Sequence, residues 1–444
     1  MENNHHELKK GLLPRHVQFI ALAGMIGTGI FKGSSDTLNI AGPSVIFTYL
    51  IGGLLLFIVM AALGEMAIAF PNHNVQLLLY RAFGFKLSFI TGWLYWINWT
   101  IVITVELLAA GSFLQFWYPS IPLWLLSLIC AAVIIGINLF PVKYYGELEF
   151  WFAGIKIIAL VAFIFLGALI IFGVFPSDIG DPLANYTAHG GFFPHGVSGM
   201  LSAFLVVMFS YGGAELIGVA VTETKDAERV MPSIIKGAVW RVIIFYIFPI
   251  LIICGIMPWN SVNGQESPFV QVFTMTGLPG AAHVMNFILL TAVLSAANSG
   301  IYATSRTLFS MAKSGVAPKG LMRTSSNGIP FIGLMITSLC LLVGVFLAYI
   351  SPSNIISYLM TIPGFTIMIV WIGICSAHLK LRPQYKVTPS FRVKWFPYTT
   401  IIAIVVLSLI FIGFILTPNN IIGSTVSLLI VGVLVVLSLK AKKK

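Results

Sequence analysis

Three ionisable side chains stand inside long apolar stretches of the sequence, where they could carry protons or bind a charged ligand. They are Glu106 in WINWTIVITVELLAAG, Lys156 in EFWFAGIKIIAL and Glu215 in FSYGGAELIG. We identify no local partner in the sequence that neutralises any of them. A buried carboxyl is suited to carrying a proton, although Glu106 and Glu215 could also be protonated, hydrogen-bonded core groups. Lys156 could instead extend along its helix toward water.

Four further ionisable residues lie within apolar stretches but nearer their ends, or near an opposite charge. Lys32 and Asp36 are four residues apart, so they could neutralise each other on one helix face. Lys32 could instead restrict which ligands the protein accepts, near the external path to the site. Glu65 and Arg306 lie near span ends, where we expect them to anchor a helix or form an ion pair.

Two glycine clusters predict interrupted helices. Residues 22–33 read LAGMIGTGIFKG, and residues 209–218 read FSYGGAELIG. Glycine weakens helices, and glycine-interrupted spans at matching places in two halves of a chain indicate an inverted-repeat transporter with its site at the membrane midplane. Backbone N–H groups freed by a break favour a carboxylate, and freed carbonyls favour an ammonium group. The alternative is that small residues only allow close helix packing.

The amino-acid composition indicates that these helices lie in a lipid bilayer. Hydrophobic residues make up 58% of the 444 residues, charged residues 9%, and the mean hydropathy is +0.97. About twelve apolar runs are long enough to cross a bilayer, which predicts an all-α polytopic membrane protein. The predicted spans are 17–38, 43–69, 87–116, 122–141, 149–173, 197–222, 233–257, 281–310, 331–350, 354–378, 396–416 and 420–440.

The net charge of +11 is explained by orientation and not by nucleic acid binding. With the N-terminus inside, the Lys and Arg residues of the joints all fall on the cytoplasmic side, and the longest opposite joints, 174–196 and 258–280, contain none. This predicts a multi-pass protein of the cell membrane with both termini cytoplasmic. The polar start has no signal-peptide pattern, so the first helix is expected to remain. The four cysteines lie in apolar spans without metal or disulfide spacing, and no cofactor is expected.

Five stretches carry a resemblance to a known family: IGTGIF, GWLYWINWTIVITVELLAAG, GELEFWFAGIK, FSYGGAELIGVAVTET and LSAANSGIYATSRTLFSMAKSGVAPK. Together they resemble the amino acid transporter family of the amino acid–polyamine–organocation superfamily, from about residue 12 to residue 440. The resemblance implies a leucine-transporter-type 5+5 inverted repeat plus two C-terminal helices. It divides the chain into a cytoplasmic N-terminus (1–16), two five-helix repeats (17–173 and 197–378) and helices 11 and 12 (396–440), which form one transport domain.

The resemblance also implies roles for particular residues. The substrate would be held by Ile26, Gly27, Thr28, Gly29, Glu106, Phe209, Ser210, Tyr211, Gly212 and Gly213. Lys156 would couple transport to protons, with Ser295, Asn298 and Ser299 as neighbours, and Glu215 and Glu106 are further candidates. Two features depart from the family pattern: FPNHNVQLLLYRAFG replaces a PxSGSF-like segment, and Lys32 replaces an apolar residue.

The expected function is proton-coupled uptake of an amino acid by alternating access. An exchanger of the same fold and a non-transporting amino acid sensor remain alternatives. A membrane enzyme is disfavoured because HExxH and GxSxG motifs are absent, and an ion channel because no filter repeat is present. The substrate side chain stays open, since Glu106 suits a cation whereas Trp96, Trp99, Phe209 and Tyr211 suit a neutral group.

Overall fold

The computed structural model describes residues 25–71, 73–140, 142–174, 181–216, 233, 235, 237, 240–262, 266–325, 328–350, 355–385, 389–416 and 421–441. Within these ranges the chain is helical and contains no strand. The main helices are α2 (Thr28–Phe31), α3 (Gly33–Ala41), α4 (Val45–Ala69), α5 (Val75–Phe83), α6 (Phe85–Gln115), α7 (Leu123–Ile137), α8 (Val142–Ile171), α9 (Gly196–Tyr211), α12 (Phe248–Ile256), α13 (Pro268–Met275), α14 (Ala281–Lys313), α15 (Phe331–Ile350), α16 (Ile355–Leu381), α17 (Tyr398–Leu416) and α18 (Ile421–Lys440).

The helices agree with the predicted polytopic bundle. Eight helical stretches of the described chain are long and apolar enough to cross a bilayer, and three shorter apolar helices cover 123–137, 196–211 and 240–256. One of the eight stretches, Gly33–Ala69, joins the described half of the first predicted span to the second span through a short 3₁₀ turn. Parts of the first, sixth and seventh predicted spans, including residues 17–24 and 217–222, lie outside the described residues.

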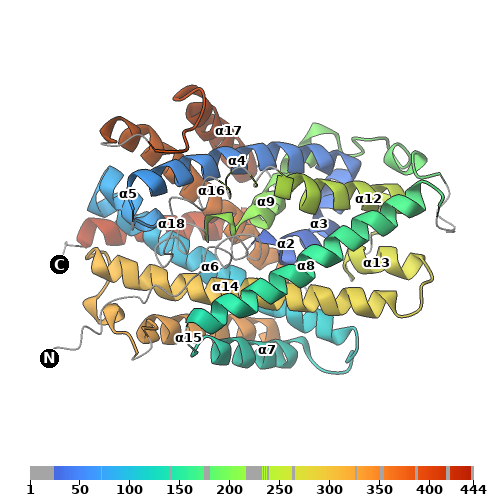
Figure 1. The fold of residues 1–444 in the computed structure, drawn as a ribbon, viewed down its shortest axis with the longest axis horizontal. Helices are drawn as coiled ribbons and strands as arrows, with labels where there is room; N and C mark the ends of the chain where they lie inside the picture. The colour runs from blue at the N-terminus through green and yellow to red at the C-terminus, as the bar shows by residue number, and fades with distance from the viewer. Residues whose placement is uncertain are drawn as a thin grey trace.

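Helix α6 lies at the centre of the bundle, where it packs against α14, α16 and α7. In Figure 1, α14 runs along the length of the molecule and α8 crosses it obliquely. Helix α9 packs against α3, α4 and α16. The two predicted breaks therefore lie on neighbouring elements, because the break before α2 and the break after α9 belong to helices in contact.

Both glycine clusters interrupt their helices. Before α2, Gly27 has an extended backbone with φ −145° and ψ −152°, so α2 begins only at Thr28, and the Gly27 carbonyl accepts a hydrogen bond from Phe31 N at 3.3 Å. After α9, the helix ends at Tyr211, and Gly213 takes a φ of +106°, which side-chain-bearing residues rarely adopt. A short 3₁₀ turn, Ala214–Leu216, follows. The predicted interruptions are present at both places.

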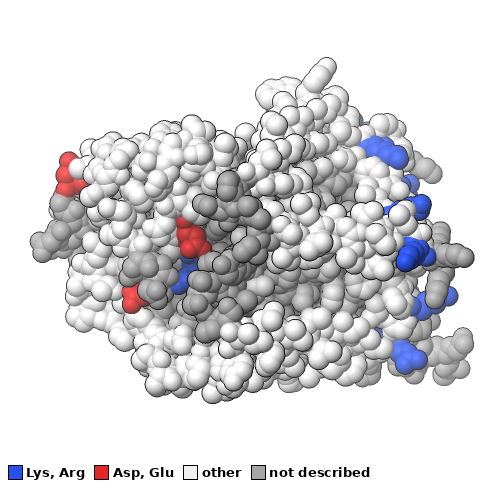
Figure 2. All heavy atoms as spheres, turned by 180° about the vertical axis from the view of Figure 1, so that it is seen from behind, with Lys and Arg blue, Asp and Glu red and all other residues white. Residues whose placement is uncertain are grey.

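Lys and Arg side chains gather at one end of the molecule, seen at the right of Figure 2. We call this the basic end. The exposed Lys and Arg residues of the described joints belong to the segments after α4, α14, α16 and α18: Arg81, Lys86, Lys313, Lys319, Arg323, Lys380, Arg392, Lys394 and Lys440. Consecutive spans alternate in direction, so these joints share one end, as the charge pattern predicted.

Candidate functional site

Glu106 of α6 occupies the first break. Its carboxylate accepts hydrogen bonds from the backbone N–H of Thr28, at 3.0 Å to each oxygen, and from the Thr28 hydroxyl at 2.7 Å. A Cβ atom on Gly27 would lie 2.5 Å from Glu106 Oε1. The glycine is therefore required for the close approach of a carboxylate to bare backbone.

The carbonyl side of the same break meets Lys156 of α8. Lys156 is fully buried, and its Nζ donates to the carbonyl of Ile26 at 2.9 Å. Glu106 and Lys156 also interact electrostatically. A carboxylate thus caps the freed N–H of Thr28, while an ammonium group caps the freed carbonyl of Ile26. Two helices from elsewhere in the first half of the chain satisfy the polar groups that the break exposes.

Tyr246 links the two breaks and was not predicted from the sequence. Its hydroxyl lies within hydrogen-bonding distance of the carbonyls of both Met25 and Ser210, the latter at 2.8 Å. Tyr246 lies in a π-helical segment, Ile243–Ile247, immediately before α12. Such segments widen one turn of a helix and are frequent at functional sites. The segment carries a buried hydroxyl to both interrupted helices.

The second break is held by fewer side chains. Gly213 N donates to Glu215 Oε2 at 3.1 Å, whereas Oε1 of this fully buried carboxyl has no hydrogen-bond partner among the described residues. The two breaks approach each other closely, because a Cβ on Gly29 would lie 2.4 Å from the Cα of Ser210. Tyr211 points elsewhere: its hydroxyl donates to the Tyr49 carbonyl at 2.6 Å.

A small cavity of about 20 Å³ lies between the breaks. Its lining residues come from both interrupted helices, from α6 and from α14: Met25, Gly27, Gly29, Asn98, Trp99, Val102, Glu106, Phe209, Ser210, Gly212, Gly213 and Ala296. Most of the predicted substrate residues therefore meet at one place. A volume of this size holds about one water molecule. An amino acid would fit only after the helices separate or Glu106 leaves Thr28.

The predicted α14 residues lie beside Lys156 but bond to another group. Ser295 Oγ donates to Glu149 Oε2 at 2.7 Å, and Asn298 Nδ2 donates to Glu149 Oε1 at 2.8 Å. Ser299 also contacts this carboxylate. Glu149 is fully buried and interacts electrostatically with Lys156. Lys156 therefore has a partner on its own helix, contrary to the prediction, and Glu149 was not predicted because it stands at the first position of the predicted span.

The remaining predicted charges lie away from the breaks. Lys32, partly exposed, interacts electrostatically with Asp36 and Glu266, and it lines a second cavity of about 290 Å³. The negative charges of Asp36 and Glu266 both act on Lys32, and its two proposed roles, pairing with Asp36 or narrowing the choice of substrate, stay predictions. Glu65 pairs with Arg382 at 3.1 Å. Arg306 lies over the Tyr302 ring, 4.0 Å from its centroid.

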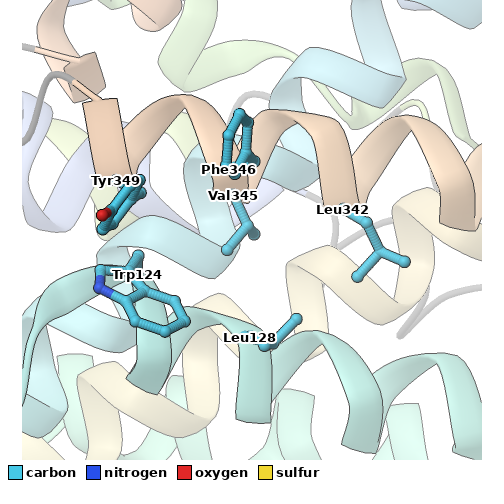
Figure 3. Close-up of a pocket in the computed structure, with 6 residues that line it drawn as sticks. All are labelled: Trp124, Leu128, Leu342, Val345, Phe346 and Tyr349. Carbon is cyan, nitrogen blue, oxygen red and sulfur yellow. The ribbon is translucent and has the colours of Figure 1, made fainter.

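A larger groove of about 400 Å³ lies between α7 and α15 (Figure 3). Trp124 and Leu128 of α7 face Val345, Phe346 and Tyr349 of α15 across it. Its walls are aliphatic and aromatic. Binding sites for polar small molecules place a few convergent polar groups in the cavity, and this groove has none comparable to those at the breaks. We therefore place the candidate site between the breaks.

These features define a class of protein. A polytopic helical bundle with two interrupted helices, whose freed backbone groups meet at a buried polar cavity, is a membrane transporter of the leucine-transporter type. Similarity in structure agrees: a crystal structure of the Eremococcus coleocola manganese transporter matches with a TM-score of 0.62 at 14% identity, covering 96% of this chain and 94% of that chain. At this identity the likeness concerns the fold.

The chain belongs to the amino acid permease family, whose pattern it matches over residues 16–443. It is 41% identical to an uncharacterised amino acid permease of Bacillus subtilis (strain 168), with 100% of both chains covered. It is 40% identical to the D-serine/D-alanine/glycine transporter of Escherichia coli (strain K12), covering 85% of this chain and 81% of the relative. The gamma-aminobutyric acid permease of Bacillus subtilis is 38% identical, covering 91% and 87%. The resemblance seen in the sequence is confirmed, and the protein is an amino acid permease.

Proposed function

We propose that this permease takes up a small zwitterionic amino acid together with a proton by alternating access. The observation that carries the proposal is the arrangement at the first break, where Thr28 N–H binds a carboxylate and the Ile26 carbonyl binds an ammonium group. A zwitterion presents the same two groups. The contacts of Glu106 and Lys156 thus indicate that Thr28 N–H favours a negative group and that the Ile26 carbonyl favours a positive one.

Glu106 then links substrate to proton. A substrate carboxylate that binds Thr28 N–H must displace the Glu106 carboxylate, since two like charges close together are unfavourable. Protonation of Glu106 removes this repulsion and weakens its hydrogen bonds to Thr28. One proton taken up from the external side would therefore accompany one amino acid. Lys156, fixed beside the break, would change its contacts as Glu106 leaves.

The second break supplies the remaining contacts. Phe209 and Ser210 line the cavity, and the buried Glu215 accepts a hydrogen bond from Gly213 N at 3.1 Å. Gly212 and Gly213 allow backbone approach. The site has two walls, one on each interrupted helix, which suits two five-helix repeats moving against each other. The relatives named for D-serine, D-alanine, glycine and gamma-aminobutyric acid transport favour a small, uncharged side chain.

The basic end is assigned to the cytoplasm of a cell membrane by the positive-inside rule. External solution then reaches the site from the opposite end, past Lys32 and Glu266. Exchange of one amino acid for another remains the second candidate. The contact between Glu106 and Thr28 N–H also suits exchange. The carboxylate of a second amino acid, and not that of Glu106, would then occupy Thr28 N–H while the carrier returns to its starting conformation.

A competition panel tests the substrate. The purified protein in proteoliposomes takes up radiolabelled glycine or D-alanine, and each of the other amino acids competes in turn. The proposal expects saturable uptake, counterflow, and competition by small zwitterions, with lysine, arginine, glutamate and aspartate weak. Saturable binding without flux would identify a sensor. Uptake that occurs only when the liposomes are preloaded with amino acid would identify an exchanger.

A further inference from the structure

Glu149 is a buried carboxylate that the substrate site does not use. It shows no exposure, and it lies two helical turns before Lys156 on α8, so both side chains stand on one face of the helix. A fully buried ionisable side chain within a membrane helix marks a functional group or its partner. Lys156 lies between Glu149 and Glu106 and interacts with both.

We propose that Glu149 is the proton-release group of the carrier: it takes the coupled proton from Lys156 and passes it toward the basic end. This proposal rests on the proposed proton coupling and adds the residue by which the proton leaves. In the step, an N–H bond of the Lys156 ammonium breaks and an O–H bond forms at Glu149, and the neutral Lys156 amine then takes the coupled proton from the carboxylic acid of Glu106, which returns to the carboxylate. The electron pair remains on the nitrogen, and no electron is transferred.

The hydrogen-bond network around Glu149 favours this direction. Asn138, directly after α7, donates from Nδ2 to Asn298 Oδ1 at 2.7 Å. Asn298 therefore presents its own Nδ2 to Glu149, and Ser295 donates from its hydroxyl. The polar chain extends from Glu149 to the end of α7, which lies on the side of Lys156 nearer the basic end, since α8 starts there.

The donors to Glu149 from α14 are neutral. Ser295, Asn298 and Ser299 stabilise the carboxylate without fixing its charge as an Arg would. Lys156 acts on Glu149 electrostatically, and both Glu149 and Glu106 act on Lys156. A neutral cage with one neighbouring cation lets Glu149 exchange a proton when Lys156 moves. The proton then leaves to water at the basic end, which restores the carboxylate.

The decisive variant is Glu149→Gln, which keeps the volume and removes ionisation. In proteoliposomes we expect accumulation driven by an inward proton gradient to fall more than about tenfold, while counterflow, which needs no net proton movement, persists within a few-fold of the unmodified protein. The pH dependence of net uptake should flatten. Glu149→Asp retains a titratable group and should restore part of the accumulation with a shifted pH profile.

Several outcomes would overturn the proposal. Gradient-driven accumulation by Glu149→Gln equal to that of the unmodified protein would exclude Glu149 from proton release. Equal losses of counterflow and accumulation in a folded variant would assign Glu149 to the support of Lys156 alone. If Glu149→Gln does not fold, Glu149→Asp decides, and an unchanged pH profile there contradicts the proposal. If the unmodified protein shows counterflow but no proton-driven uptake, the proposed coupling of transport to protons is wrong, and the role of Glu149 in proton release is wrong with it.

Discussion

Two fully buried carboxylates, Glu65 on α4 and Glu149 on α8, are held in different ways. Glu65 lies 3.1 Å from Arg382 Nε and 3.3 Å from His378 Nε2, and it accepts a 2.6 Å hydrogen bond from Val393 N. Glu149 accepts hydrogen bonds from the neutral side chains of Ser295 and Asn298, and it shares one cation, Lys156, with the first break.

The difference separates a static role from a mobile one. Glu65 joins α4, α16 and the segment before α17, and the guanidinium of Arg382 also donates to the Val393 carbonyl at 3.1 Å. Removing Arg382 would leave the fully buried Glu65 carboxylate without its cation. The central carboxylates instead contact groups that a substrate or a proton can replace. We therefore expect changes at the Glu65 cluster to affect folding, and changes at the breaks to affect transport.

The largest effect is expected for Glu65→Ala. The change removes the fully buried carboxylate that Arg382 pairs with and that Val393 N donates to, and breaking a buried pair costs about 3–5 kcal/mol. We expect a large loss of folded protein, measured by thermal unfolding and size-exclusion chromatography in detergent. Asp181→Ala, which removes an exposed acid, is the control. An unchanged melting temperature for Glu65→Ala would refute the static role.

Gly29→Ala should abolish substrate binding while the protein still folds. The new Cβ would lie 2.4 Å from the Cα of Ser210, so the two interrupted helices could not keep their distance. Uptake of radiolabelled amino acid should fall to background. Gly154→Ala on α8 serves as the matched control, because nothing lies within 4 Å of its added Cβ. An unchanged substrate affinity in Gly29→Ala would show that the first break does not form part of the substrate site.

Tyr246→Phe should weaken transport by an intermediate amount. The hydroxyl is lost from the carbonyls of Met25 and Ser210, and an unpaired buried acceptor costs about 1–3 kcal/mol. We expect kcat/KM for uptake to fall roughly 10-fold, with a smaller change in melting temperature than for Glu65→Ala. If the melting temperature fell and kcat/KM did not, Tyr246 would belong with the static group.

The smallest effect is expected for Lys32→Met. Lys32 is partly exposed and lines the second cavity, and partly exposed ion pairs contribute about 0–1 kcal/mol. KM should change by less than about fivefold, and proton coupling should be retained. Competition by acidic and basic amino acids provides the sharper readout. A strong change in preference between them would assign Lys32 to substrate selection and not to pairing with Asp36 and Glu266.

The sequence predicted those parts of the site that carry a large local penalty. Glycines inside a span and charges far from a span end are costly in hydrocarbon, so the breaks, Glu106, Lys156 and Glu215 could be identified without coordinates. The helices of the bundle followed from the length of their apolar runs. The interruptions were predicted to the residue at Gly27 and at Gly212 and Gly213.

Other residues carried no such signal. Glu149 stands at the predicted start of its span, where a charge costs little, and its partners Ser295 and Asn298 lie about 150 positions further along the chain. Tyr246 lies within an apolar run that gives no sign of a special role. The π-helical turn that directs its hydroxyl toward the breaks depends on packing in the folded protein. The Glu65 cluster joins positions more than 300 residues apart. Long-range pairing of this kind appears only in the folded chain.

The central claim is that substrate and proton enter together, and proton movement measures it most directly. Proteoliposomes loaded with a pH-sensitive dye, in choline medium without sodium and without a preset pH gradient, receive the amino acid that competes best. We expect internal acidification that follows amino acid addition, saturates with amino acid concentration and is lost in Glu106→Gln. Amino acid flux without acidification, or flux that requires sodium, would contradict it.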